Sequence, residues 1–458
     1  MRRYASITAY AALAVALMFI IAGCGGVRII PLSAKIDGAD RKFEKAETMQ
    51  IRTDNPENKK KDQEKQQKLY DDALNAYLEV VAADPGGKYF QRADFQIAEI
   101  YKRRYQWDKA TEHYNEIVKV APTGYFGDRA KSSISAIRDN RRVIQEKTRT
   151  YQNRRLLEDA ESQNMAAEAL YDVARAYQAL GNYGEAIRRY ERLVEEFPKH
   201  KLAPQAQFQV GNIYFYTLYD YSNEGGWGAF VKVVEKFPDS YEATQATTLL
   251  KESASILTEI KLDQDDIWKY TNKKALEYKE AGHEVLPNEL YVMGYSDRIV
   301  QDFQNIASGW IQMKNYPYAI AAYRELATNL SYKKFSAADA LYRIGALYQK
   351  AGEYERAIAA FDEMMRLAPE STWRDEAVYE QAVSYRAIRE FGKAYEGFKA
   401  YLTLLETEIR EDYYREAEQM VRQYELDQDG DGYLFYQEQE AGTSDTDAND
   451  YPGAAATE

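Results

Sequence analysis

A spacing pattern of aromatic residues, alanine and proline recurs along most of this 458-residue chain. In the clearest copies, alanine follows an aromatic residue by three positions, a second aromatic residue follows by four more, and proline by eight more. Spacings of three and four place side chains on one face of a helix, and proline ends that helix. The pattern therefore predicts short helices at regular intervals. Its clearest copies are Tyr70, Ala73, Tyr77, Pro85; Trp107, Ala110, Tyr114, Pro122; Tyr183, Ala186, Tyr190, Pro198; and Tyr354, Ala357, Phe361, Pro369.

A preceding helix extends the pattern to a hairpin. Six residues before most copies lies another aromatic residue, and three residues before that lies a small one, as with Tyr348 and Gly345. A small residue lets two helices approach closely, and aromatic rings fill the remaining gap. Each copy is thus predicted to be the second helix, B, of a hairpin whose first helix, A, stops near a turn glycine such as Gly181 or Gly352. Looser copies begin at Asn223, Tyr316 and Phe391.

This pattern resembles the tetratricopeptide repeat, a helical hairpin of about 34 residues. The resemblance implies an all-α fold in which about seven to nine hairpins stack into a superhelical solenoid. We expect an N-terminal array at 63–260, with one degenerate unit within 128–163, and a C-terminal array at 299–425. The intervening 261–298 fits no repeat and is either a partner site or a lineage-specific loop. The concave side of such a superhelix binds peptides or helices of other proteins, and its partner-binding residues stay unassigned.

The N-terminus begins with Arg2 and Arg3 and continues with an apolar run, 9–23. That run is shorter than the ~20 residues that a membrane-spanning helix needs, and it has the size of a signal-peptide core. It ends at IIAGCGG, which contains Cys24, the only cysteine of the chain. This ending resembles the bacterial lipobox, which implies that a signal peptide, 1–23, is removed and that Cys24 carries a covalent lipid. The alternative is an ordinary signal peptide with a chance cysteine.

The residues after Cys24 are glycines, whereas many lipoproteins retained in the inner membrane carry aspartate there. By this resemblance we expect anchoring in the outer membrane of a two-membrane bacterium, on its periplasmic side or at the cell surface. The segment 24–62 shows no sustained period and is highly charged near its end. We interpret it as the lipidated cysteine followed by a flexible spacer, with a helix near 39–48.

The C-terminal segment 426–458 contains DQDGDGYLFYQE, which begins at Asp427. This sequence matches the twelve-residue EF-hand calcium loop in the spacing of its acidic residues and in the glycine at position six, Gly432. Position nine is Phe435, so a water molecule would complete the oxygen shell that Ca²⁺ requires. The match assigns these ligands: Asp427, Asp429, Asp431, the carbonyl of Tyr433, and Glu438 bidentately.

The tail after this loop, GTSDTDANDYPG, resembles bacterial calcium repeats of the thrombospondin type 3 or dockerin kind. Its Asp445, Asp447 and Asp450 are therefore candidates for additional ligands. The alternative is a solvated acidic tail that binds no metal. We expect a structural role for the calcium, because the loop has no partner hand and only a short exit helix.

The composition argues against two classes of protein. A net charge of −13 is the opposite of the basic excess typical of nucleic-acid binders. We find no metal-ligand spacing among the three histidines and no phosphate loop or nucleophile elbow, so we expect no enzyme activity.

The basic stretch 129–155 is either a solvated helix face or a contact for an acidic partner or lipid headgroup. The tyrosine-rich stretch 214–222 either packs its hairpin or forms a docking surface.

A lipobox followed by such repeats resembles the tetratricopeptide-repeat lipoproteins of the outer membrane, among them the BamD-like subunits of β-barrel assembly and the repeat proteins of the Tol-Pal system. BamD-like proteins share a helix B of the form YGEAIRRYERLVEEFP, which stands here at 183–198. The resemblance implies a lipid-anchored scaffold that binds envelope proteins in its concave groove, in outer-membrane protein assembly or envelope organisation. The alternatives are a surface module that recognises glycan or peptidoglycan, and a motility or secretion pilotin.

Overall fold

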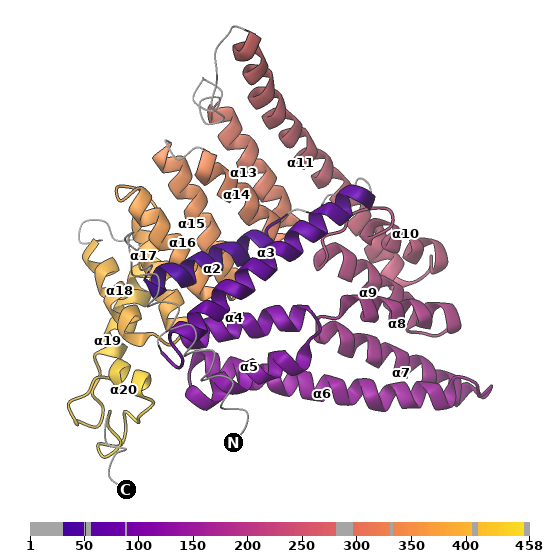
Figure 1. Ribbon diagram of the computed structural model, residues 1–458, viewed down its shortest axis with the longest axis horizontal. Coiled ribbons are helices and arrows are strands. Elements are labelled where there is room, and N and C mark those ends of the chain that lie inside the picture. The colour runs from indigo at the N-terminus through magenta and orange to yellow at the C-terminus, as the bar shows by residue number, and fades with distance from the viewer. Residues whose placement is uncertain are drawn as a thin grey trace, which may run out of the picture.

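The chain is a curved array of helices that wraps around its own N-terminal hairpin (Figure 1). Within the described residues the array has eighteen helices and no strand, which confirms the predicted all-α class. None of these described helices has both the length and the hydropathy needed to cross a bilayer. The computed structural model describes residues 31–49, 51, 56–87, 89–280, 296–329, 333–404 and 411–452.

Fourteen of these helices pair as seven consecutive hairpins, each made of a helix A and a helix B. Two long helices, α6 (Tyr125–Arg154) and α11 (Tyr241–Glu280), stand between hairpins, and α19 (Glu411–Tyr424) and α20 (Phe435–Ala441) follow them. The hairpins are α2 (Leu32–Glu47) with α3 (Pro56–Ala83), α4 (Phe90–Arg103) with α5 (Trp107–Val120), α7 (Ala160–Ala179) with α8 (Tyr183–Glu196), α9 (Ala203–Tyr216) with α10 (Gly226–Lys236), α13 (Ser296–Gln312) with α14 (Tyr316–Asn329), α15 (Lys334–Lys350) with α16 (Tyr354–Leu367), and α17 (Arg374–Ala387) with α18 (Phe391–Leu404).

Close approach of the two helices explains the repeated residue pattern. A Cβ atom added at Gly345 of α15 would lie 2.4 Å from the ring of Phe361 on α16. In the α9–α10 hairpin, the same atom at Gly211 would lie 2.5 Å from the ring of Phe230. Both rings are fully buried. The small residue of helix A therefore makes room for the aromatic ring of helix B, as the sequence predicts.

Gly345→Ala is expected to lower the free energy of unfolding by about 1–3 kcal/mol, because the added methyl group would overlap the Phe361 ring. The matched control is Gly184→Ala on α8, where nothing lies within 4 Å of the added atom. There alanine should stabilise by up to about 1 kcal/mol through its higher helix propensity. Urea denaturation followed by circular dichroism measures both changes. Equal effects of the two variants would contradict the close-approach explanation.

The turn between helices A and B uses the left-handed backbone region in six hairpins. The predicted turn residues Gly181 and Gly352 both have φ of 76°, where glycine carries no steric penalty. Residues other than glycine occupy this position in the other four, although they are disfavoured there. A glycine signal in the sequence therefore marks only some of the turns. In the four turns without glycine, the residues with positive φ are Tyr105, Tyr219, Lys314 and Arg389.

Two long helices differ from what the sequence pattern predicts. The degenerate unit expected within 128–163 is largely one helix, α6, rather than a hairpin of its own. No proline lies between its start and Arg154 to interrupt it, and its glycine, Gly127, lies in the first turn. Likewise α11 continues to Glu280, so the insertion at 261–298 begins as an extension of a helix. The following residues, 281–295, lie outside the described part of the chain.

The flexible spacer expected at 24–62 also differs where the structure describes it. Here α2 forms an amphipathic helix that buries Ile36, Ala39 and Phe43 against α3 and α4, and α3 begins at Pro56. Spacings of three and four residues place the three apolar side chains on one face of α2. Within this segment, α2 is thus helix A of the first hairpin. Figure 1 shows α2 and α3 crossing the middle of the array, with the other helices around them.

Candidate functional site

A buried polar cluster joins the first hairpin to the C-terminal half of the array. Glu47, at the end of α2, accepts hydrogen bonds from Arg356 of α16, at 2.5 Å, and from Arg103 of α4. The side chains of Arg356 and Glu47 are only 10% and 13% exposed. Burial alone would raise the pKa of Glu47, but the two guanidinium groups outweigh it and hold that pKa below its ordinary value. Arg356 also lies over the Phe43 ring, 4.7 Å from its centroid.

Other contacts extend this cluster along the first hairpin, and we call the whole set the interior contact. It joins residues as far as 309 positions apart in the chain. The N-terminal hairpin thus fills space in the interior that the sequence analysis assigns to a partner protein. Sequence reasoning missed this, because ion pairs between distant helices leave no local pattern. The further contacts are Arg324 to Glu44 at 3.1 Å, the Ile51 N–H to the Tyr318 hydroxyl at 3.2 Å, and Lys59 to Asp220 at 2.7 Å.

A shallow, open hollow of about 300 Å³ lies between two successive A helices, α13 and α15, and the turn before α17. We call it the A-helix hollow. Its residues come from α13, from the first half of α15 and from the turn that leads into α17. By contrast, a second hollow, of about 350 Å³, is lined by α5 alone, so no second element shapes it. The A-helix hollow is lined by Gln304, Phe335, Asp339, Arg343, Ser371 and Trp373, among others.

The A-helix hollow has one aromatic side and one charged side. The Phe335 side chain is 65% exposed, and the Trp373 ring stacks on Tyr342 with 4.7 Å between ring centroids. Asp339 accepts hydrogen bonds from Arg343 at 3.0 Å and from Gln304 of the preceding A helix at 3.3 Å. Such a surface offers a peptide both apolar contact and hydrogen-bonding groups.

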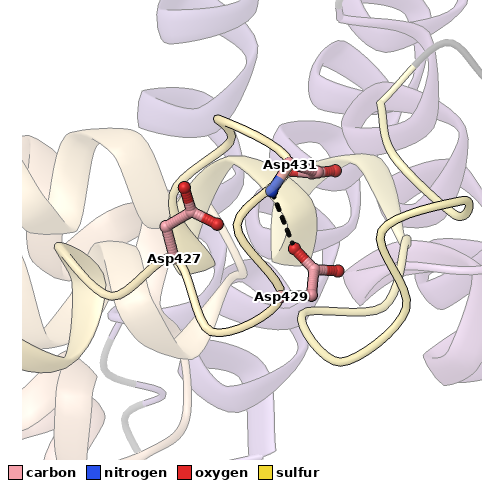
Figure 2. A group of neighbouring side chains, drawn as sticks. All are labelled: Asp427, Asp429 and Asp431. Carbon is pink, nitrogen blue, oxygen red and sulfur yellow. Dashed lines mark hydrogen bonds between the residues drawn. The ribbon is translucent and has the colours of Figure 1, made fainter.

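The C-terminal loop brings three of the predicted calcium ligands together. One carboxylate oxygen from each of Asp427, Asp429 and Asp431 lies within 4.8 Å of the other two, and Figure 2 shows the three side chains on one turn of the loop. The N–H of Gly432 donates to Asp427 at 3.2 Å, and that of Tyr433 donates to Asp431 at 2.8 Å. Gly432 has φ of 95°, as the sharp turn at position six requires.

Glu438 provides the test of whether these residues fit a cation. It lies outside that group of three, yet it is fully buried and neither of its carboxylate oxygens has a hydrogen-bond partner. One oxygen each of Asp429 and Asp431 is likewise buried without a donor. Burial, together with the neighbouring carboxyl groups of Asp445, Asp429 and Asp431, raises the pKa of Glu438 to about 7. Buried acidic oxygens without donors are costly, so the donor set fits a hard cation such as Ca²⁺.

The remaining sequence features have structural neighbours or lie outside the described residues. Tyr221 stacks on Trp310 with 5.8 Å between ring centroids and accepts a hydrogen bond from Asn315 at 3.0 Å. Part of the stretch 214–222 therefore packs against the α13–α14 hairpin. Cys24 lies outside the described residues. Several residues of the basic stretch 129–155 form ion pairs with acidic side chains. They include Arg138, Arg141, Lys147 and Arg155.

Comparisons with known proteins locate two repeats directly. Family models of the tetratricopeptide repeat match 168–200 and 338–371, while no curated protein matches the chain. Similar solved structures include the TPR2AB domain of yeast Sti1 in its pHSP90 complex, with 16% identity, 73% of this chain and 98% of that chain covered, and a TM-score of 0.24. Yeast Tom70 has 12% identity, 86% and 96% coverage, and a TM-score of 0.24. The two family matches coincide with hairpins α7–α8 and α15–α16, so the chain contains tetratricopeptide repeats.

Proposed function

We propose that this protein is a membrane-anchored scaffold that holds a segment of a partner protein in the A-helix hollow. One observation carries this proposal: two A helices, α13 and α15, and the turn before α17 line an open hollow although the N-terminal hairpin fills the interior. Stacked helical hairpins use extended surfaces of this kind for binding. The expected occupant is a peptide or helix of an envelope protein. It would place one apolar side chain against Phe335 and polar groups toward Asp339 and Arg343.

The anchor in this proposal is a lipid on Cys24, inserted in the outer membrane. Helix α2 begins eight positions after Cys24, a span of at most about 29 Å. The N-terminal hairpin would therefore stay close to the bilayer. Cys24→Ser is expected to abolish incorporation of labelled palmitate, because the thiol that would carry the acyl chains is absent. Labelling of this variant at the wild-type level would contradict lipid anchoring at Cys24.

Arg343→Glu tests the scaffold proposal. The variant places two carboxylates side by side, at 339 and 343, in the A-helix hollow and should release partner proteins that co-purify with the wild-type chain from solubilised membranes. The matched control is Arg366→Glu, a charge reversal on the exposed side of α16, outside the A-helix hollow. Circular dichroism should show the same helical signal for all three chains. Partner recovery that is equal in the two variants would contradict binding at this surface.

Recognition of glycan is the second candidate function, and one observation favours it. Phe335 and Trp373 both line the A-helix hollow, and aromatic rings can stack on sugars. The repeated aromatic residues, however, are buried between helices, with Tyr114, Tyr190 and Phe361 fully buried, so the described repeats form no aromatic stripe. Binding of the purified chain to isolated cell wall, lost in Phe335→Ala, would favour the glycan function over the scaffold.

We further propose that the C-terminal loop binds Ca²⁺ through Asp427, Asp429, Asp431, the carbonyl of Tyr433 and Glu438. The buried oxygens of Glu438 that have no donor support this proposal. Extracellular calcium modules bind at about 10⁻⁴–10⁻³ M, so the ion would act as a structural component. Glu438→Gln should abolish calcium binding measured by titration calorimetry. Unchanged binding in this variant would contradict the assigned ligand set.

A further inference from the structure

The acidic tail after α20 folds back over the calcium loop. Gly442 has φ of 77°, and its N–H donates to the carbonyl of Glu438 at 2.7 Å. The chain reverses direction there, as it commonly does at a left-handed helix C-terminus. Near the end of the described tail, Tyr451 stacks on Tyr433 of the loop, with 6.1 Å between ring centroids and 7° between ring planes. The tail is therefore a folded part of the same module.

Asp445 is the acidic residue that this reversal brings to the loop. Its side chain accepts a hydrogen bond at 3.3 Å from the N–H of Gln428, the second residue of the loop, and only 9% of the residue is exposed. Asp445 also lies beside Glu438, the buried carboxylate without a hydrogen-bond donor. By contrast, Asp447 is exposed, and its carboxylate accepts a hydrogen bond from Asn449 within the tail.

We propose that Asp445 is a further ligand of the cation held by the loop, an inference that rests on the proposed calcium site. With one oxygen from each aspartate, the carbonyl of Tyr433 and two oxygens from Glu438, the loop supplies six oxygens, and Phe435 at position nine contributes no side-chain oxygen. Ca²⁺ takes six to eight oxygen ligands. A carboxylate from Asp445 replaces the absent ligand at position nine, so the ion joins the loop, α20 and the tail.

This ligand also links the cation to the end of the repeat array. The ring of Tyr436 on α20 stacks on Tyr395 of α18, with 4.9 Å between centroids. The N–H of Gly392, in the first turn of α18, donates to Glu440 of α20 at 2.7 Å. Terminal repeats of a solenoid need a cap over their outer side. Helix α19 covers part of the last hairpin, α17–α18, and the calcium-loaded module completes that cap.

The test compares Asp445→Asn with Asp447→Asn in the full-length chain, titrated with CaCl₂ in a calorimeter. Asparagine keeps an oxygen that can accept the Gln428 N–H, so Asp445→Asn removes the charge and leaves that hydrogen bond possible. We expect this variant to raise the Kd for calcium by about tenfold or more. Asp447→Asn should bind as the wild type does, because Asp447 contacts only the tail in this account.

Calcium should also protect the tail from proteolysis in the wild type and in Asp447→Asn, but much less in Asp445→Asn. If the wild type binds calcium and Asp445→Asn binds equally well, Asp445 is not a ligand and the loop site stands without it. If the wild type binds no calcium at millimolar concentration, the loop site and the role of Asp445 both fail.

Discussion

Arg356→Ala is expected to lower the free energy of unfolding by about 3–5 kcal/mol, the usual result of removing one partner from a buried ion pair. In the wild type, Arg356 donates to Glu47 at 2.5 Å and to Glu353 at 2.6 Å, and its guanidinium covers the Phe43 ring. The variant leaves Glu47 buried with Arg103 as its remaining partner. The loss should therefore appear in urea denaturation as a lower midpoint.

The control is Arg366→Ala on the same helix, an exposed residue whose loss should change stability by no more than about 0.5 kcal/mol. Arg356→Ala should also increase the radius of gyration measured by small-angle X-ray scattering, because α2 loses a contact with α16. Equal stability and equal radius in the two variants would show that the interior contact does not hold the N-terminal hairpin in place.

Phe361→Ala is expected to cost about 3–5 kcal/mol, the usual range for truncating a buried phenylalanine. The ring is fully buried between α15 and α16. It lies over Gly345, and its centroid is 5.8 Å from the centroid of the Tyr342 ring. Removing it leaves a cavity inside a hairpin that its neighbours cannot refill without moving helices. Thermal denaturation and urea denaturation both measure this loss.

Phe335→Ala is the matched control, since Phe335 lies on α15 but is 65% exposed. This change should alter stability by no more than about 0.5 kcal/mol. A loss in Phe361→Ala below about 1 kcal/mol would mean that the aromatic positions of the repeat are not the core. The register assigned to helices A and B would then be wrong.

The sequence predicts the hairpins well because their physics is local. The aromatic and small residues that recur at spacings of three and four are those that the structure buries between helices A and B, as Ala186 and Tyr190 illustrate. Helix length is harder to predict where no breaker residue stands, so α6 and α11 run further than the repeat pattern indicates. Helix α2 escaped prediction as a repeat element because its hairpin lacks the usual spacing before Tyr70.

The candidate sites also differ in how far the sequence alone can predict them. The proposed calcium ligands are contiguous in the chain, so the spacing from Asp427 to Glu438 is enough to propose them, and calcium binding there stays a prediction. The A-helix hollow combines Gln304, Asp339 and Trp373 from three repeats, and which side chains line it depends on how successive hairpins stack. The interior contact is still harder to predict from the sequence, because Glu47 and Arg356 are common charged residues that only the curvature of the array brings together.

Filling of the interior by the first hairpin changes where a partner should bind. In this protein the interior charges of α4, α14 and α16 are already paired with α2, through Arg103, Arg324 and Arg356. A partner would have to displace these ion pairs and the buried Phe43 to enter there. The A-helix hollow requires no such displacement, so it is the more accessible surface.

The most direct measurement places a photo-reactive amino acid at position 335 in intact cells. As a control, the same amino acid is placed at position 241 on α11, where Tyr241 is 72% exposed and does not line the A-helix hollow. Each chain is irradiated, purified and analysed by mass spectrometry. The scaffold account predicts one defined envelope protein crosslinked from position 335, absent from position 241 and lost when Arg343→Glu is added. No protein adduct from position 335, or the same adducts from both positions, would contradict binding in the A-helix hollow.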